Sequence, residues 1–106
     1  MINIFLTDDH EMVRQGIRAL IEREPGLSVT GEGGSGEETL SNLMKLKPDL
    51  LLLDLMLPDI SGMEVLEKSK KALPRLRVII LSMYDNKVHL LESLRRGADG
   101  YVIKGS

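Results

Sequence analysis

Three aspartates stand just after apolar runs that have the composition of buried strands. Asp8 and Asp9 come soon after the apolar run 2–6, and Asp54 directly follows the leucine run 50–53. Three neighbouring carboxylates repel one another unless a hard divalent cation lies between them, and Mg²⁺ prefers oxygen ligands, keeps bound waters and accepts phosphate oxygens. These residues therefore predict a magnesium site suited to phosphoryl transfer.

Two further polar side chains occupy the same kind of position. Ser82 follows the apolar run 78–81, and Lys104 follows the run 101–103. A hydroxyl can donate a hydrogen bond to a phosphate, and a lysine ammonium can pair with a phosphoryl group in transfer. Alone, Ser82 is typical of a strand-end hydroxyl and Lys104 of a solvated surface charge. Their placement together with the aspartates favours phosphoryl chemistry.

The aspartates also have a purely structural interpretation. The sequence contains three capping boxes for helix N-termini, formed by Asp8 with Glu11, Ser35 with Glu38, and Ser61 with Glu64. Asp8 alone fits a helix cap as well as it fits a metal ligand. Two successive aspartates are more than one cap needs, and a charge that ends a leucine run gains nothing from burial unless it is used. Asp9 and Asp54 therefore favour a functional site.

The elements that must position these residues alternate between strands and helices. Apolar, partly β-branched segments predict five strands, at 2–6, 27–30, 50–53, 78–81 and 101–103. Residues at helical spacing between them predict four apolar helix faces, which are Val13, Ile17, Leu20 and Ile21; Leu40, Leu43 and Met44; Met63, Leu66 and Leu73; and Leu91, Leu94 and Ala98. This alternation predicts a doubly wound α/β fold, whose functional residues lie beyond the carboxyl ends of parallel strands.

Composition excludes several other classes of protein. The 106 residues suffice for one domain, and 14 Lys and Arg against 16 Asp and Glu give a net charge of -2. This balance, with Phe5, Tyr84 and Tyr101 as the aromatic residues, disfavours direct nucleic-acid binding. The absence of cysteine excludes disulfides, thiolate zinc sites and thiol catalysis. No apolar run approaches the roughly 18 residues of a membrane span, so we expect a cytoplasmic protein.

Taken together, the motifs resemble the receiver domain of bacterial two-component response regulators. The resemblance covers almost the whole chain and is carried by the segments 4–10, 54–62, 81–84 and 97–101, and by Lys104. It is closest to receivers that precede a LuxR-type helix-turn-helix domain, as judged from Asp9, His10, Arg14 and Gly16 and from the segment 81–85. It implies a flavodoxin-like, five-stranded parallel sheet of order 2-1-3-4-5.

The resemblance also implies a role for each site residue. Asp54 would accept a phosphoryl group from a sensor histidine kinase, Lys104 would pair with that group, and Ser82 and Tyr101 would form the switch. The implied Mg²⁺ ligands are Asp8, Asp9, Asp54 and the backbone carbonyl of Met56. The domain would then be a signalling switch rather than an enzyme. Its surface at the fourth helix and fifth strand would control homodimerisation and an attached DNA-binding domain, with no membrane partner.

The carboxyl end departs from the family pattern. Receivers have a fifth helix, whereas residues 104–106 are all that follow the last predicted strand. We therefore expect residues 1–106 to be one receiver domain truncated at its C-terminus, without the helix-turn-helix output domain. Apolar side chains of the third to fifth strands would then be open to water, or covered by a second copy in a dimer.

Three other functions fit parts of the sequence. The segment 31–36 matches G-x-G-x-x-G and has Asp54 about 20 residues further on, as in a dinucleotide-binding fold, but this leaves Asp8, Asp9, Ser82 and Lys104 without roles. A magnesium-dependent phosphohydrolase could use the same acids, although so short a chain has no cap domain to enclose a substrate. An interaction domain whose acids are only helix caps would show no Mg²⁺ dependence.

Overall fold

A computed structural model describes residues 1–83 and 85–104. Tyr84, which belongs to the aromatic residues and to one of the motifs above, lies outside the described residues, as do residues 105–106. Along the chain the elements are β1 (Ile2–Thr7), α1 (Glu11–Glu22), β2 (Leu27–Gly33), α2 (Gly36–Leu46), β3 (Leu50–Asp54), α3 (Gly62–Ala72), β4 (Arg77–Ser82), α4 (Lys87–Arg95) and β5 (Gly100–Ile103).

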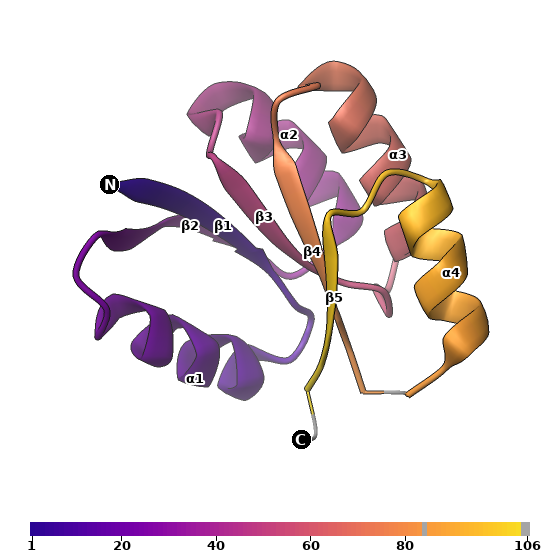
Figure 1. Cartoon of the computed structure of the whole chain (residues 1–106). Coiled ribbons are helices and arrows are strands. Elements are labelled where there is room, and N and C mark those ends of the chain that lie inside the picture. The colour runs from indigo at the N-terminus through magenta and orange to yellow at the C-terminus, as the bar shows by residue number, and fades with distance from the viewer. Residues whose placement is uncertain (84, 105–106) are drawn as a thin grey trace.

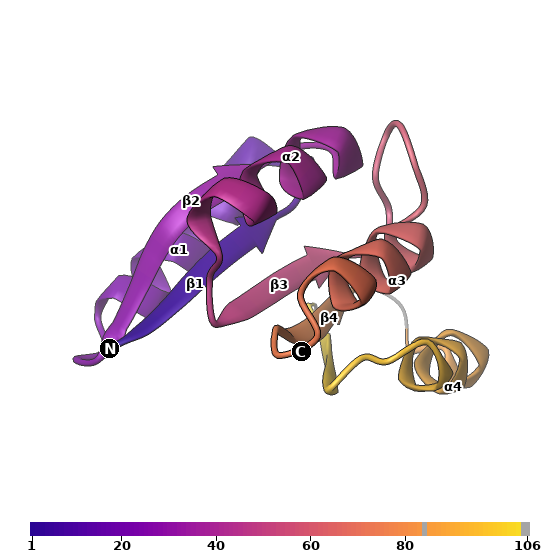
Figure 2. The same ribbon diagram turned by 90° about the horizontal axis from the view of Figure 1, so that it is seen from above.

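The five strands form one parallel sheet in the order β2-β1-β3-β4-β5, so the predicted fold class and strand order are confirmed (Figure 1). Helix α1 lies on one side of the sheet, while α2 and α3 lie on the other, with α4 beyond α3 (Figure 2). The described residues contain the four helices that the sequence predicted. None of these helices is long and apolar enough to span a membrane.

The main core lies between the sheet and the helices α2 and α3. Side chains alternate across a strand, so every second residue of the leucine run points to this side. The fully buried members include Phe5 of β1, Leu51 and Leu53 of β3, and Val65 and Leu66 of α3. Burial of this one face holds β1 and β3 side by side, and these two strands carry the aspartates.

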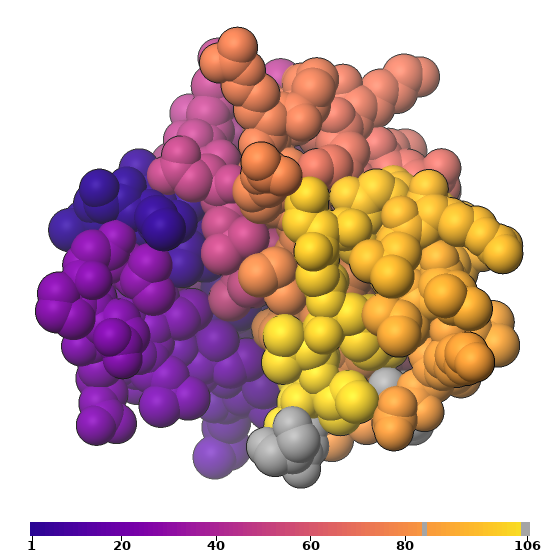
Figure 3. All heavy atoms as spheres, viewed as in Figure 1, coloured from indigo at the N-terminus to yellow at the C-terminus, as the bar shows by residue number. Residues whose placement is uncertain are grey.

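The opposite face of the sheet is covered at β1, where Ile4 and Leu6 are buried, but it is open beside β5. Helix α1 has no buried residue, and Leu20 of its predicted apolar face is 62% exposed. Val102 of β5 is 49% exposed, so the expected exposure of apolar side chains on this side is seen at β5, whereas Leu81 of β4 is buried. A hollow of about 360 Å³ separates α1 from β4 and β5, and β5 lies at the molecular surface (Figure 3).

Helix α4 also differs from its prediction. Leu91 and Leu94 were expected to pack on the sheet, yet both are nearly half exposed. Ser93 is the buried residue of this helix, and Ala98 packs into the core from the segment that follows it. Gly97 adopts a φ of 109°, the left-handed conformation that commonly ends a helix.

Two of the three predicted caps are confirmed. Ser35 accepts a hydrogen bond from the backbone N–H of Glu38, and Ser61 accepts one from Glu64. Asp8 does not cap α1, because His10 occupies the N-cap position of that helix. The Asp8 side chain is therefore available to the site.

The glycine-rich segment packs against the core and does not cradle a dinucleotide. A Cβ atom on Gly36 would lie 2.3 Å from Cγ1 of Ile60, and one on Gly31 would lie 2.7 Å from Cδ1 of Leu46. The backbone N–H groups of Gly36 and Glu37 at the start of α2 both donate to the carboxylate of Asp59, at 2.8 Å each. The place where a pyrophosphate would bind is thus filled by Asp59.

Candidate functional site

The strand register brings the predicted residues to one edge of the sheet. Thr7 of β1 pairs with Leu53 of β3, so the next residues along the two strands, Asp8 and Asp54, emerge side by side. Asp54 in turn pairs with Leu81 of β4, which places Ser82 one step further along the same edge. These residues lie at the carboxyl ends of the strands, where open parallel sheets bind their ligands.

Lys104 joins the two buried aspartates. It follows β5, and its backbone N–H donates to the carbonyl of Ser82 at 2.7 Å. Its Nζ lies 2.7 Å from Oδ2 of Asp8 and 3.0 Å from Oδ2 of Asp54. All three side chains are almost completely buried. One ammonium group therefore balances two carboxylates in a low-dielectric pocket.

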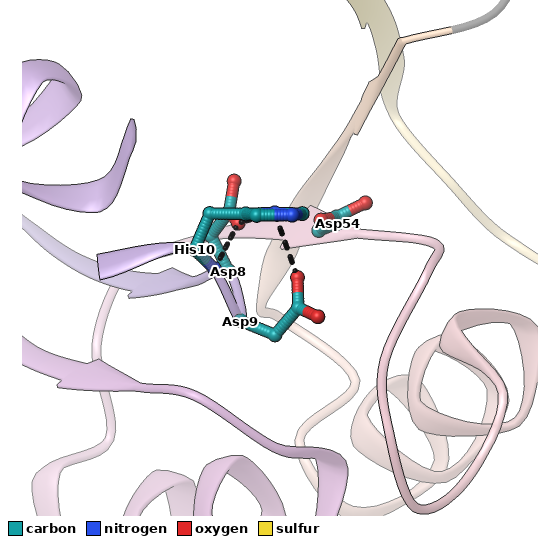
Figure 4. A group of neighbouring side chains, drawn as sticks. All are labelled: Asp8, Asp9, His10 and Asp54. Carbon is teal, nitrogen blue, oxygen red and sulfur yellow. Dashed lines mark hydrogen bonds and ion pairs between the residues drawn. The ribbon is translucent and has the colours of Figure 1, made fainter. Parts of the chain in front are cut away.

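Asp9 and His10 form the outer wall of the pocket. Figure 4 shows both beside Asp8 and Asp54. The Asp9 carboxylate is one-third exposed, and its Oδ1 lies 3.0 Å from Nδ1 of His10. Oδ1 of Asp8 accepts a hydrogen bond of 2.9 Å from the backbone N–H of His10. The turn into α1 thus fixes the orientation of the Asp8 carboxylate.

The environment shifts the pKa values of the two buried aspartates in opposite directions. Burial raises the pKa of Asp54, and hydrogen bonds from the Met56 backbone N–H and from Lys104 offset this only in part. Burial also raises the pKa of Asp8, but the hydrogen bonds from Lys104 and from the His10 backbone outweigh it, so the net shift is downward. The charged form is therefore stabilised more strongly at Asp8 than at Asp54.

The Lys104 ammonium is held in its charged form. Burial alone would lower the pKa of Lys104, but its hydrogen bonds to Asp8 and Asp54 prevail and raise it. At neutral pH the pocket therefore contains one permanent cation beside two buried aspartates and the partly exposed Asp9. The carboxylates outnumber the cation, which is the charge balance that a divalent ion would complete.

The donor set fits Mg²⁺. One ligand atom each from Asp8, Asp9, His10 and Asp54 can be chosen so that all lie within 4.8 Å of one another. Carboxylate oxygens are preferred Mg²⁺ ligands, and the partial exposure of Asp9 leaves room for bound waters. The described residues thus form an acidic pocket compatible with Mg²⁺.

The remaining predicted residues lie around this pocket. Ser82 is buried at the end of β4. Met56 lies two residues after Asp54 and donates its backbone N–H to Oδ1 of that aspartate at 3.0 Å, while its side chain is exposed. Tyr101 is half-buried in β5 and packs against the main core. The structure therefore gathers the predicted acids, Lys104 and Ser82 at one edge, with Tyr101 further back along β5.

The sequence analysis used His10, Arg14 and the segment that contains Asp59 as marks of the resemblance, but it gave these three residues no role in the site. Nη1 of Arg14 donates to the backbone carbonyl of Asp8 at 2.5 Å and fixes the loop after β1. His10 contacts both Asp8 and Asp9 through its ring. Asp59 joins the loop after β3 to the start of α2. The adjacency of His10 to the aspartates was the one available signal, because the other two contacts join distant segments.

The fold is that of a flavodoxin-like domain with an acidic pocket at the carboxyl ends of its strands. The sequence model of the response regulator receiver domain matches residues 4–106. The chain belongs to this family, whose members are signalling proteins.

Comparisons with individual proteins agree with the family. The response regulator protein VraR of Staphylococcus saprophyticus is 41% identical over 105 residues, covering 97% of this chain and 49% of that protein. VraR of Staphylococcus aureus is 38% identical over 103 residues, with the same coverage. The chain thus spans about half the length of the curated relatives it matches.

Solved structures support the same assignment. A LuxR-family two-component response regulator from Aurantimonas sp. has a TM-score of 0.96 and 35% identity, covering all of this chain and 76% of that one. The isolated receiver domain of RcsB from Salmonella enterica, determined with the phosphomimetic BeF3-, has a TM-score of 0.93 and 30% identity, covering 99% of this chain and 78% of that one. The predicted resemblance to receivers with LuxR-family relatives is thereby confirmed.

Proposed function

We propose that this domain is a phosphorylation-dependent switch in which Asp54 accepts a phosphoryl group. The observation that carries the proposal is the pairing of Lys104 with both Asp8 and Asp54 at the carboxyl edge of the sheet. A buried carboxylate beside a fixed ammonium group is suited to covalent phosphoryl chemistry, because the ammonium can balance charge on the phosphoryl oxygens.

In the proposed step, a carboxylate oxygen of Asp54 forms a bond to phosphorus. The phosphorus–nitrogen bond of a phosphohistidine on a sensor histidine kinase breaks, and its electron pair leaves with the imidazole, which takes up a proton. Asp8, Asp9, Asp54 and the backbone carbonyl of Met56 would hold Mg²⁺, which supplies charge neutralisation for the phosphoryl oxygens. Burial of Asp54 restricts access of water to the aspartyl phosphate.

Ser82 and Tyr101 would convert this modification into a change of surface. Ser82 follows Leu81, the register partner of Asp54, and we expect its hydroxyl to reach a group attached to that carboxylate. If the segment after β4 moved towards the phosphate, helix α4 would shift with it. This helix is loosely packed, because its Leu91 and Leu94 are nearly half exposed. Tyr101 on the neighbouring strand β5 would then move with it. A differential contact worth about 1–3 kcal/mol suffices for such a switch.

The proposal extends to the whole protein. The curated relatives are about twice as long as this chain, and the structural relative from Aurantimonas sp. is a LuxR-family regulator. We therefore propose that residues 1–106 are the receiver of a transcription regulator, which dimerises when phosphorylated and contacts DNA through a helix-turn-helix domain. The domain itself would act as a phosphoacceptor and not as an enzyme with a separate substrate.

The test is the intact mass of the protein after incubation with a small acyl phosphate. We expect one phosphoryl adduct in the presence of Mg²⁺ and none after chelation, with no adduct on Asp54→Asn. Glu24→Gln, which changes an exposed acid on the opposite edge of the sheet, should be modified like the unaltered chain. An adduct that forms equally well on Asp54→Asn, or no adduct on the folded chain, would contradict the proposal.

A further inference from the structure

The ring of His10 stands over the acidic pocket. His10 is the N-cap residue of α1, and its imidazole is 66% exposed. Nδ1 lies 3.0 Å from Oδ1 of Asp9 and 3.3 Å from Oδ1 of Asp8, and the ring faces the pocket that also contains Asp54 (Figure 4). The helix does not use this side chain, since His10 makes no side-chain capping hydrogen bond.

These distances match the spacing of ligands around one cation. Two neighbouring ligands of an octahedral ion with bonds of about 2.1 Å lie about 3 Å apart. Nδ1 of His10 stands at nearly this distance from one oxygen of Asp9 and one of Asp8. Nδ1 is therefore placed to share one cation with an oxygen of Asp9 or of Asp8, and Asp54 belongs to the same group of ligand atoms, all within 4.8 Å of one another.

The chemistry of the ring agrees with this geometry. In the neutral tautomer with hydrogen on Nε2, the lone pair of Nδ1 points towards the two carboxylate oxygens. Facing lone pairs repel, and a cation between them turns the repulsion into attraction. Imidazole nitrogen is a preferred ligand of Ni²⁺, Cu²⁺ and Zn²⁺, whereas Mg²⁺ prefers oxygen and water.

We infer that His10 is a nitrogen ligand of this metal site and makes it bind imidazole-preferring divalent ions in addition to Mg²⁺. The inference rests on the proposed function, because it requires a cation at Asp8, Asp9 and Asp54. Mg²⁺ would use the carboxylates, the backbone carbonyl of Met56 and waters, while Ni²⁺ or Cu²⁺ would also recruit the ring nitrogen of His10. His10 is thus a residue that determines metal specificity.

The experiment is a calorimetric titration of the untagged chain with Ni²⁺ and, separately, with Mg²⁺. His10→Asn removes the ring and retains a residue favoured at the N-cap. We expect this variant to lose at least about tenfold in Ni²⁺ affinity and to change less than about threefold in Mg²⁺ affinity. His89→Asn is the matched control, because His89 is the only other histidine and lies outside the cluster. It should change neither affinity.

A spectroscopic readout tests the bond itself. One directly bound nitrogen splits the electron paramagnetic resonance lines of Cu²⁺, and this splitting should disappear in His10→Asn but persist in His89→Asn. If His10→Asn binds Mg²⁺ and Ni²⁺ like the unaltered chain, the inference is overturned and the proposed function stands. If the unaltered chain binds no Mg²⁺, the proposed metal site fails and the inference fails with it.

Discussion

The ammonium group of Lys104 lies 3.0 Å from Oδ2 of Asp54, although the two residues are 50 positions apart in the sequence. The same ammonium lies 2.7 Å from Oδ2 of Asp8. The end of β5 is thereby fastened to the ends of β1 and β3. Because the pocket is buried, this contact serves both the stability of the fold and the proposed chemistry.

Replacing Lys104 by methionine should destabilise the domain strongly. The variant keeps most of the side-chain volume and leaves two buried carboxylates without their cation, so we expect a loss of about 3 kcal/mol in unfolding free energy. Urea denaturation at pH 7 measures this loss. Lys68→Met is the matched control, because Lys68 pairs with Glu64 on the surface and should cost less than about 1 kcal/mol. Equal losses in the two variants would contradict the account of the pocket.

Asp54→Asn should stabilise the domain in metal-free buffer. Burial raises the pKa of Asp54, so its charged form is costly at pH 7, and removing that charge should add about 1 kcal/mol to the unfolding free energy. Added Mg²⁺ should then stabilise the unaltered chain more than the variant, since one ligand is lost. Thermal unfolding with and without a chelator measures both effects. A variant that is less stable than the unaltered chain after chelation would contradict this explanation.

We expect the hydrogen bonds of Asp99, which lies away from the site, to be lost in acid. Burial raises the pKa of Asp99, but hydrogen bonds from the Val78 backbone and from Lys70 outweigh it, so the pKa lies below its ordinary value of 3.8. The stability from this carboxylate is therefore present above about pH 4 and is lost as the pH falls through the lower, folded value. Asp99→Asn should cost about 1–2 kcal/mol at pH 7. The difference from the unaltered chain should shrink below pH 4, and a constant difference in urea titrations would refute this.

Replacing Gly36 or Gly16 by alanine should change the unfolding free energy in opposite directions. A Cβ on Gly36 would lie 2.3 Å from Ile60 and 2.9 Å from Val65, so Gly36→Ala should cost about 1–3 kcal/mol. A Cβ on Gly16 of α1 would meet no atom of the described residues within 4 Å, so Gly16→Ala should gain about 0.5–1 kcal/mol from helix propensity. Chemical denaturation of both variants measures these changes in unfolding free energy. The packing account fails if Gly36→Ala is tolerated as well as Gly16→Ala.

Local pattern in the sequence predicted the strands and the residues that follow them, while the strand order came from the family resemblance. Continuous apolar runs identified the strands, and the rule that parallel strands bind ligands at their carboxyl ends selected Asp8, Asp54 and Ser82. The observed register, with Thr7 opposite Leu53, explains why the residues selected by that rule lie together. The helix caps at Ser35 and Ser61 were also predictable, because each joins residues three positions apart in the sequence.

Contacts between distant segments were not predictable in the same way. The spacing of Val13 and Leu20 indicated a buried helix face, but burial depends on what covers that side of the sheet, and both residues are exposed. The hydrogen bonds of Asp59 to the start of α2 depend on the path of a loop, which no periodicity encodes. The contact of the His10 ring with Asp9 depends on the turn into α1 in the same way.

The most direct test of the central claim is the position of the phosphoryl group. Borohydride reduces an aspartyl phosphate to homoserine, so the chain would be treated with an acyl phosphate and Mg²⁺, reduced, and sequenced as peptides by mass spectrometry. We expect homoserine at position 54 and nowhere else. Homoserine at position 8 or 9, or an adduct on a histidine with position 54 unmodified, would contradict it.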